Sequence, residues 1–339
     1  MKIKVSLGTA QSLGLVEKRI EAPVTAAHLL VGENCAFSCA FCPQGQAGED
    51  SSGRFLSRIS WPEFPMEEVV ELLLKVYRDG QIDRACIQMV HGGRYREQVA
   101  EFFRLMQQKS CGSLEIPISV NGVIDSITQA QRLFTMGAGR LGLALDAASA
   151  ELFSIYKGGS PEIWLQRLEL LCELGKRYPA RVSTHVIAGL GETEQQISTV
   201  TQILTNSRVT LGLFAFTPVR HTPLEDRAPP AMDSYRRIQL VHFGITQGVI
   251  NLEQIQFDES GTIVSVPDKL LSSPRVLRGE PFETSGCPGC NRPYYNERPG
   301  QTPYNYPHAL TGNQALQALL ETNLTTSDKA ASLVEREDN

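Results

Sequence analysis

The feature that most constrains the fold of this 339-residue chain is the alternation of short apolar runs with longer segments of helical periodicity between residues 28 and about 265. Such alternation is typical of repeated β-α units around a parallel sheet. Strands are expected at 27–32, 84–90, 114–120, 140–146, 181–189 and 210–219, and helices at 66–80, 96–109, 127–137, 162–178, 192–206 and 234–247. Weaker runs at 253–257 and 262–266 are expected to be a seventh and an eighth strand. The pattern predicts an α/β fold, a TIM-like (β/α) barrel, complete or partial, with its site at the carboxyl ends of the strands.

Changes in residue composition and periodicity divide the chain into three parts. We assign residues 1–27 to an N-terminal extension, 28–270 to the barrel and 271–339 to a C-terminal tail. The tail contains SGCPGCNRPYYNERPGQTPYNYP, which is rich in Pro, Gly and Tyr and has neither helical nor strand periodicity. It is therefore expected to be irregular, apart from a short helix at 313–321.

Composition and charge narrow the class of protein. Hydrophobic residues make up 42% of the chain, which is enough for a large core. The net charge is −5 and no long Lys/Arg block occurs, so nucleic acid is not an expected partner. No apolar run approaches the roughly 18 residues of a membrane span, and the N-terminus lacks the apolar region of a signal peptide. We expect a cytoplasmic protein without a membrane partner.

Three of the eight cysteines are crowded into ENCAFSCAFCPQG, directly after the first expected strand. Three thiolates without a nearby fourth suit a four-iron, four-sulfur (4Fe-4S) cluster that leaves one iron open. The spacing Cys35-x3-Cys39-x2-Cys42, with Phe41 before the last cysteine, resembles the signature of the radical S-adenosylmethionine (SAM) superfamily. The alternatives are three structural thiols or a zinc loop that takes a distant ligand.

Further stretches resemble the same superfamily. After the second strand MVHGG supplies a glycine pair, the fourth strand ends in LALDAAS, and the fifth ends in VIAGLGET. In biotin synthases an aspartate at the fourth strand contacts the ribose, and an asparagine stands where this chain has Ala144. The loop FTPVRHTPLED resembles one in biotin and lipoyl synthases. The resemblance implies a 4Fe-4S cluster, SAM, a reducing electron donor, and cofactor contacts at Phe41, Gly92, Gly93, Asp146, Ile187, Gly189 and Gly191.

One glycine-rich stretch does not point to a nucleotide. GAGRLG, residues 137–142, fits the dinucleotide pattern G-x-G-x-x-G. That site requires a strand before the glycines and a helix after them, whereas here a helix comes first. We interpret the stretch as a tight connection between a helix and a strand.

A second group of cysteines is expected near the substrate. Cys287 and Cys290 lie in the tail, and Cys86 matches a strand-two cysteine that binds the sulfur-donating cluster of biotin synthase. The other two cysteine positions of that site correspond to Ser119 and Ser183. We expect Cys86 to face the barrel interior and the tail to fold back over the mouth. The tail cysteines would then complete an auxiliary iron-sulfur cluster able to give up a sulfide.

The alternative for the tail is a structural zinc site that holds it in place, with Cys111, Cys172 or a histidine as the remaining ligand. His91 and His185 are candidates for substrate contacts, and a core role is about as expected for His185. Arg220 and Arg292 are candidates to contact a carboxylate or an amide.

Tail and barrel together resemble the two-component lipoyl synthases. That resemblance implies sulfur insertion into a protein-bound octanoyl chain, with an octanoylated lipoyl domain or H protein as substrate and a second radical SAM subunit as partner. Two alternatives remain: a biotin synthase-type enzyme acting on a small molecule, with a structural metal site in its tail, and a non-enzymatic subunit that carries a cluster.

Overall fold

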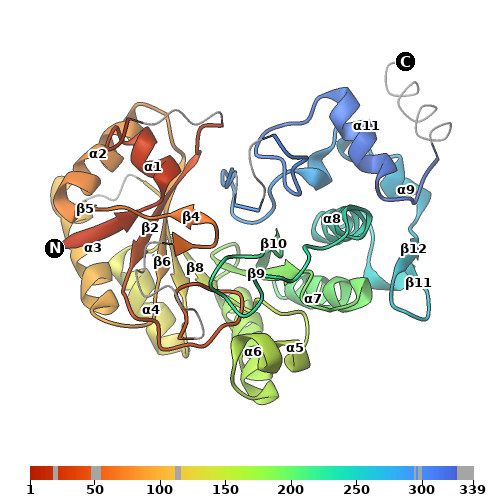
Figure 1. Ribbon diagram of the computed structural model, residues 1–339, viewed down its shortest axis with the longest axis horizontal. Helices are drawn as coiled ribbons and strands as arrows, with labels where there is room; N and C mark the ends of the chain where they lie inside the picture. The colour runs from red at the N-terminus through yellow and green to blue at the C-terminus, as the bar shows by residue number, and fades with distance from the viewer. Residues whose placement is uncertain (18–21, 47–54, 111–115, 294, 297–299, 327–339) are drawn as a thin grey trace.

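The computed structural model describes residues 1–17, 22–46, 55–110, 116–293, 295–296 and 300–326 (Figure 1). Its main sheet has eight strands in the order β10-β9-β8-β7-β6-β2-β1-β5. Six of them run parallel. These are β2 (Ala26–Val31), β6 (Arg84–Met89), β7 (Ile118–Gly122), β8 (Arg140–Leu143), β9 (Val182–Ala188) and β10 (Thr210–Ala215). The predicted α/β fold with a partial TIM-like barrel is confirmed.

Helices follow the parallel strands and cover the outside of the sheet (Figure 1). They are α2 (Met66–Arg78), α3 (Tyr95–Lys109), α4 (Ile127–Met136), α6 (Pro161–Arg177) and α7 (Glu194–Asn206), close to the predicted ranges. The strands are buried on both faces, as β2 is at all six positions, because helices cover one side and the barrel interior the other. Helix α5 (Ala150–Lys157) was not predicted.

The N-terminal residues belong to the sheet. Strand β1 (Lys2–Val5) pairs antiparallel with β2 and with β5 (Glu63–Pro65). Helix α1 (Leu7–Ser12) follows it, and a separate hairpin joins β3 (Phe55–Leu56) to β4 (Ile59–Ser60). The segment assigned to an extension thus supplies one of the eight strands.

The prediction of a seventh and an eighth barrel strand is wrong. The two segments are β11 (Gln256–Phe257) and β12 (Ile263–Ser265), which pair only with each other, as an antiparallel hairpin outside the main sheet. Oδ1 of Asp258 accepts hydrogen bonds from the backbone N–H groups of Ser260 and Thr262, at 2.9 Å each, and so fixes a tight turn. A turn this short reverses the chain and leaves no room for a crossover helix between parallel strands.

The tail forms a second core against α8 (Met232–Thr246). It contains α9 (Asp268–Leu271), α10 (Pro274–Leu277) and α11 (Gly312–Leu320), with short 3-10 turns at Leu252–Gln254 and Glu280–Phe282. The helix predicted at 313–321 is confirmed. Arg236 of α8 is fully buried and donates to Glu321 at 2.9 Å and to the Tyr304 carbonyl at 2.8 Å. These bonds tie the tail to α8.

The barrel is open on one side, and the tail fills the gap. In the described part of the chain β10 pairs with β9 alone. Next to β10, the Ser285 hydroxyl accepts from the Leu213 N–H at 2.8 Å, and next to β2 the Asn291 side chain accepts from the Thr25 N–H at 3.0 Å. Figure 1 shows this blue segment between β10 and the orange β4 hairpin. The tail thus supplies wall where further strands would close a complete barrel.

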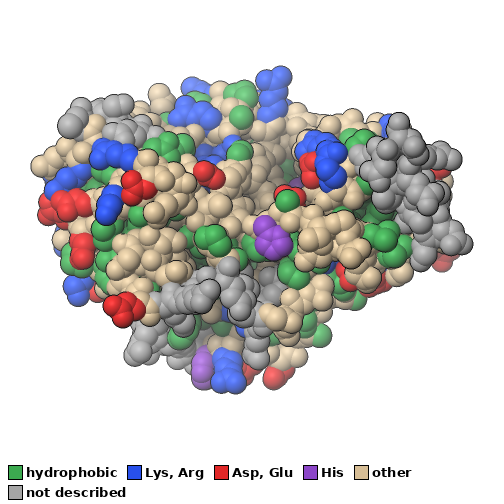
Figure 2. All heavy atoms as spheres, turned by 90° about the horizontal axis from the view of Figure 1, so that it is seen from above, with side chains coloured by type: hydrophobic (Ala, Val, Ile, Leu, Met, Phe, Trp, Pro, Cys, Tyr) green, Lys and Arg blue, Asp and Glu red, His purple; other side chains and the backbone are tan. Residues whose placement is uncertain are grey.

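One face of the molecule mixes both signs of charge. On the face shown in Figure 2, Lys and Arg side chains alternate with Asp and Glu and gather in no single basic patch. None of the described helices has the length and apolar character needed to cross a bilayer.

Candidate functional site

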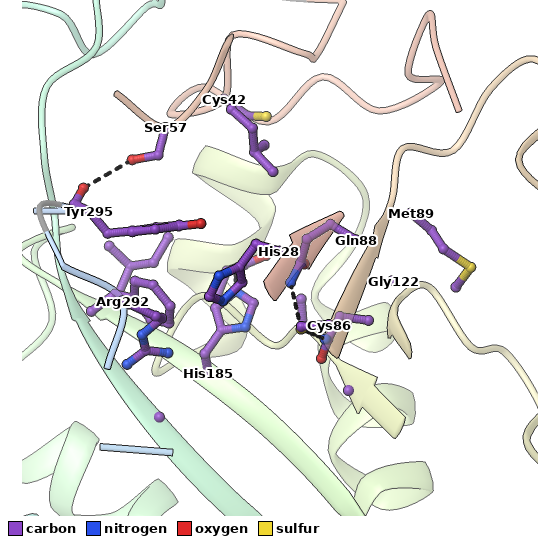
Figure 3. Close-up of a pocket in the computed structure, with 18 of the residues that line it drawn as sticks. His28, Cys42, Ser57, Cys86, Gln88, Met89, Gly122, His185, Arg292 and Tyr295 are labelled. Carbon is purple, nitrogen blue, oxygen red and sulfur yellow. Dashed lines mark hydrogen bonds and ion pairs between the residues drawn. The ribbon is translucent and has the colours of Figure 1, made fainter. Parts of the chain in front are cut away.

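A cavity of about 340 Å³ occupies the barrel interior (Figure 3). We call Cys35, Cys39 and Cys42 the first trio, and Cys86, Cys287 and Cys290 the second trio. All six of these cysteines line the cavity, although they come from a loop, a strand and the tail. The two trios that the sequence predicted separately therefore face one space.

The first trio lies in the loop that leaves the carboxyl end of β2. The Ala36 N–H donates to the carbonyl of His91, which follows β6, at 2.9 Å. The Ala40 N–H donates to the carbonyl of Tyr156 on α5 at 2.7 Å. Within the loop, the Cys42 N–H donates to the Cys39 carbonyl at 3.1 Å. These bonds hold the trio at the carboxyl ends of the strands, where the barrel fold places its chemistry.

The donor set of the first trio fits a cluster with one open iron. It offers three soft sulfur donors within eight positions. Burial raises the pKa of Cys39 to about 11 and that of Cys42 to about 12. Without a bound cation these thiols are therefore protonated at neutral pH, and loading of iron must release their protons.

The glycine pair packs against the cluster loop. A Cβ on Gly92 would lie 2.1 Å from the carbonyl oxygens of Glu33 and Asn34, and one on Gly93 would lie 2.7 Å from the Glu33 side chain. Gly93 also has a positive φ of 58°. Neither glycine lines the cavity. In this structure the pair lets the β6 loop approach the start of the first trio, and its expected contact with SAM stays a prediction.

Cys86 of β6 faces the interior, as predicted, and its sulfur receives two hydrogen bonds. The side-chain amides of Gln88 and Asn121 donate to Sγ at 3.1 and 2.8 Å (Figure 3). Asn121 fits because Gly142 on the neighbouring strand has no side chain, since a Cβ there would lie 1.6 Å from its Oδ1. Amide donors favour the thiolate form that binds metal, but burial outweighs them and raises the pKa of Cys86 well above its usual range.

The tail cysteines approach the barrel from the other end of the strands. Arg84, the first residue of β6, donates to the Pro288 carbonyl at 2.8 Å, and the Thr25 hydroxyl donates to the Gly289 carbonyl at 2.8 Å. The expectation that the tail folds over the barrel mouth is therefore wrong for Cys287 and Cys290. They lie toward the amino ends of the strands because the open side of the barrel admits the tail there.

One tail sulfur, that of Cys287, lies beside one of the two strand serines. Sγ of Cys287 is 3.9 Å from Oγ of Ser183 on β9, and Cys86 is paired in register with Ser119 on β7. Among the described residues, no group of three or more His, Cys, Asp or Glu side chains converges on a single-ion site.

His28 of β2 is a further donor beside the second trio. Its Nε2 lies 3.8 Å from Sγ of Cys290, and its ring lies 5.4 Å from that of Tyr295. Burial, together with the charge of Arg292, lowers the pKa of His28 to about 3. The imidazole is therefore neutral at physiological pH.

Asp146 lies near Cys39 and Cys42 of the first trio, with both of its oxygens engaged. Its Oδ2 pairs with the buried Lys157, and its Oδ1 lies 2.6 Å from Nε2 of His185. Burial alone would raise the pKa of Asp146, but the charges of Lys157 and His185 outweigh burial and hold it below its usual range. Asp146 lines the cavity, so its predicted contact with ribose would be added to these bonds.

The motif VIAGLGET forms a turn at the carboxyl end of β9. Ile187 lines the cavity, as does Phe41, whereas Gly189 and Gly191 do not. Both glycines have positive φ, of 107° and 115°. The Glu192 carboxylate accepts from the Gly189 N–H at 2.6 Å. The two glycines thus shape the turn, and the predicted cofactor contacts at Ile187, Gly189 and Gly191 remain expectations.

The structure distinguishes the remaining candidates for substrate contacts. His91 accepts from the Val123 N–H at 2.7 Å and is a satisfied side chain at the cavity wall. Arg292 lines the cavity and stacks on Phe214 at 4.0 Å, whereas Arg220 is exposed and does not line it.

Two cysteines and one glycine stretch complete the predicted set. Cys172 lies on α6 and does not line the cavity, and Cys111 lies outside the described residues. Gly137 caps the end of α4 with a φ of 117°, and β8 begins at Arg140. The interpretation of GAGRLG as a helix-to-strand connection is confirmed.

A comparison with known protein families matches residues 29–203 to the Radical SAM superfamily, which is more than half of the chain. This range contains the first trio, the four parallel strands β6, β7, β8 and β9, and the second half of β2. The chain belongs to the radical SAM superfamily. A radical SAM enzyme uses a 4Fe-4S cluster and SAM, and the first trio is the described group that would hold such a cluster. No curated protein matches the sequence.

One solved structure shares the fold of this radical SAM chain. HydG, a maturase of the FeFe-hydrogenase, superposes with a TM-score of 0.52 at 13% identity, over 65% of this chain and 49% of HydG. The chain thus spans about half the length of that structure. Methylornithine synthase (PylB) has a TM-score of 0.48 at 15% identity, over 96% of this chain and 88% of that one. At 13% identity the likeness to HydG shows the fold alone, and the narrower resemblance to biotin and lipoyl synthases remains a prediction.

Sequence reasoning missed several residues that build the site. These are His28, Arg84, Gln88, Asn121 and Gly142, all on strands of the main sheet. The available signal was the presence of polar residues inside strands that are otherwise apolar on both faces. Each such residue needs a hydrogen-bond partner when it is buried. The partners themselves come from neighbouring strands and the tail, which one sequence does not align.

Proposed function

We propose that this radical SAM enzyme inserts sulfur into an unactivated aliphatic carbon, with a metal centre at the second trio as the sulfur donor. The observation that carries the proposal is the single cavity that both trios line. A substrate in this cavity can face the site of radical formation at one end of the strands and a sulfur source at the other. When bound, the first cluster with SAM would supply a 5′-deoxyadenosyl radical and the second centre a sulfide.

The cavity wall suits an aliphatic chain. Its apolar lining comes from the first-trio loop, the strands and the loop after β10, and it includes Leu30, Phe37, Leu56, Met89, Phe214 and Phe216. Such a wall desolvates an alkyl chain and keeps water from a reactive radical. It positions the substrate chiefly by shape, and geometry decides which hydrogen is removed.

We infer an octanoyl chain carried by a lipoyl domain or an H protein as the substrate, from the resemblance of tail and barrel to two-component lipoyl synthases. A carrier-bound chain enters tip first, and this matches a cavity that extends along the barrel. The same resemblance gives a second radical SAM subunit and a reducing electron donor as partners.

A second candidate is a small carboxylate substrate, as in biotin synthase-type enzymes. Arg292 and Lys157 both line the cavity, and Arg292 is held by its stack on Phe214 and its 2.7 Å bond to the Ser285 carbonyl. A carboxylate at Arg292 would lie beside the second trio. In that case the tail site has a structural role.

The decisive experiment follows the origin of the inserted sulfur. The full chain is reconstituted anaerobically with iron and ³⁴S-sulfide and incubated with SAM, a reductant and an octanoylated lipoyl-domain peptide, and the product is analysed by mass spectrometry. We expect ³⁴S in the product. Unlabelled or absent sulfur beside abundant 5′-deoxyadenosine would reject the second trio as the donor.

A matched pair of variants assigns the donor to its residues. The double variant Cys287→Ala, Cys290→Ala is expected to lose the thiolated product while 5′-deoxyadenosine is still formed, because the first trio is intact. Cys172→Ala is the control, since this cysteine lies on α6 away from the cavity, and it should leave both products unchanged.

A further inference from the structure

We propose that His28 is a fourth ligand of the metal centre at the second trio, bound through Nε2 beside Cys290. The inference rests on the proposed function, because it assumes that Cys86 and the two tail cysteines hold a metal centre. It adds a nitrogen donor that comes from the first barrel strand rather than from a cysteine motif.

The separation of the two donor atoms is that of two ligands on one metal ion. Nε2 of His28 and Sγ of Cys290 are 3.8 Å apart. Metal–sulfur bonds near 2.3 Å and metal–nitrogen bonds near 2.0 Å place two tetrahedral ligands about 3.6 Å apart. A small shift of either side chain would bring both onto the same metal.

The sheet register places His28 beside the third cysteine as well. His28 on β2 and Cys86 on β6 are partners in the parallel pairing. Paired residues on adjacent strands point to the same face and lie about 4.8 Å apart along the hydrogen-bonding direction. Figure 3 shows the imidazole between Tyr295 and Cys86. Cys86 and both tail cysteines line the same cavity.

The hydrogen bonding of this imidazole is incomplete in the described residues. His28 is 3% exposed, and its Nδ1 is buried without a hydrogen-bond partner in the described part of the chain. The Ala26 backbone interacts with its ring, and its Nε2 makes a long contact to the Cys290 thiol. A buried polar group with poor hydrogen bonds costs folding free energy, which a metal bond at Nε2 would offset.

The donor set of three thiolates and one imidazole suits a two-iron, two-sulfur cluster. Each iron of such a cluster takes two protein ligands. Cys290 and His28 would share one iron, and Cys86 and Cys287 the other. Imidazole in place of thiolate raises the reduction potential of such a cluster. It also gives the centre one iron that differs from the other in its bonding.

The test is pulsed EPR on the reconstituted full chain, reduced in the absence of SAM, with histidine labelled by ¹⁵N. We expect a nitrogen coupling of a coordinated imidazole that changes with the label and disappears in His28→Ala. His28→Cys should keep the centre, lose the coupling and lower its reduction potential. The control is His242→Gln, another buried histidine, whose Nε2 lies 3.1 Å from the Leu211 carbonyl, and it should keep the coupling. Circular dichroism checks that each variant folds.

The outcomes separate this inference from the proposed function. A centre without histidine coupling in the wild type, beside continued sulfur insertion, overturns the inference alone. Zinc at the second trio, with nitrogen ligation by X-ray absorption that is lost in His28→Ala, keeps the inference and overturns sulfur donation. A chain that binds no metal beyond the first cluster overturns both.

Discussion

The two cysteine trios face the same cavity, yet the chain builds them in opposite ways. The first trio spans eight consecutive positions in one loop, and backbone hydrogen bonds within and around that loop hold it. The second trio joins a barrel strand to a tail two hundred residues later, and Arg84 and Thr25 hold it by bonds to the tail backbone. A local site depends on loop geometry, whereas a site assembled from distant segments depends on the docking of the tail.

The largest effect is expected from a change in the first trio. Cys39→Ala removes one of three thiolates from a site with no spare donor, so the 4Fe-4S cluster should not assemble and 5′-deoxyadenosine formation should fall to background. Liquid chromatography of the nucleoside and EPR of the protein measure the two effects. The second trio should still take up its metal, and its simultaneous loss would show that the two sites do not assemble independently.

The same contrast explains why the first trio is easy to recognise in the sequence, whereas the residues around the second trio are not. The spacing of Cys35, Cys39 and Cys42 contains everything needed to recognise a three-thiolate site, and alternating strands and helices predicted the parallel sheet around it. His28 reads as an ordinary strand residue in AHLLVG, because its partner Cys290 is 262 positions away. Apolar periodicity does not distinguish the short hairpin of β11 and β12 from barrel strands. Its turn is determined instead by backbone N–H groups that donate hydrogen bonds to the Asp258 side chain.

The second largest effect is expected where β6 supports the first trio. In Gly92→Ala the new Cβ would meet the Glu33 and Asn34 carbonyls at 2.1 Å and push the start of the cluster loop outward. A misplacement of about 1 Å lowers the rate of a reaction governed by geometry about a hundredfold. We expect such a fall in 5′-deoxyadenosine formation, with the metal content of the second trio unchanged.

The control for that change is Gly312→Ala at the start of α11, where an added Cβ would meet nothing within 4 Å. It should leave the rate unchanged, since it adds the same methyl group in open space. Equal rates for the two variants would mean that the β6 loop does not position the first trio.

The third largest effect is expected at the buried ion pair of Asp146 and Lys157 in the cavity wall. Asp146→Asn leaves Lys157 buried without its counter-charge, and loss of one partner of a buried ion pair should lower the free energy of unfolding by about 3 kcal/mol. Because the pKa of Asp146 is held below its usual range, the stability it contributes is complete above the unfolded pKa of about 3.9 and is lost as pH falls below it. Urea denaturation between pH 7 and pH 3 should show this loss in the wild type and not in the variant.

Glu101→Gln is the comparison for the ion-pair prediction, since it breaks an exposed pair with Arg104 at 2.7 Å. Solvent screens that pair, so stability should hardly change. A loss as large as that of Asp146→Asn would contradict the argument from burial.

The smallest predicted effect distinguishes docking of the tail from charge near it. Arg84→Gln removes the bond to the Pro288 carbonyl, and loss of such a supporting contact weakens metal binding by about tenfold. Arg140 lies close enough to Cys287 to interact with it electrostatically. Its hydrogen bond, however, goes to the Thr210 hydroxyl at 2.8 Å and not to the tail. Arg140→Gln should therefore retain the metal of the second trio under a chelator challenge in which Arg84→Gln loses it. Equal loss in both would mean that positive charge, rather than the bond to the tail backbone, holds the second trio together.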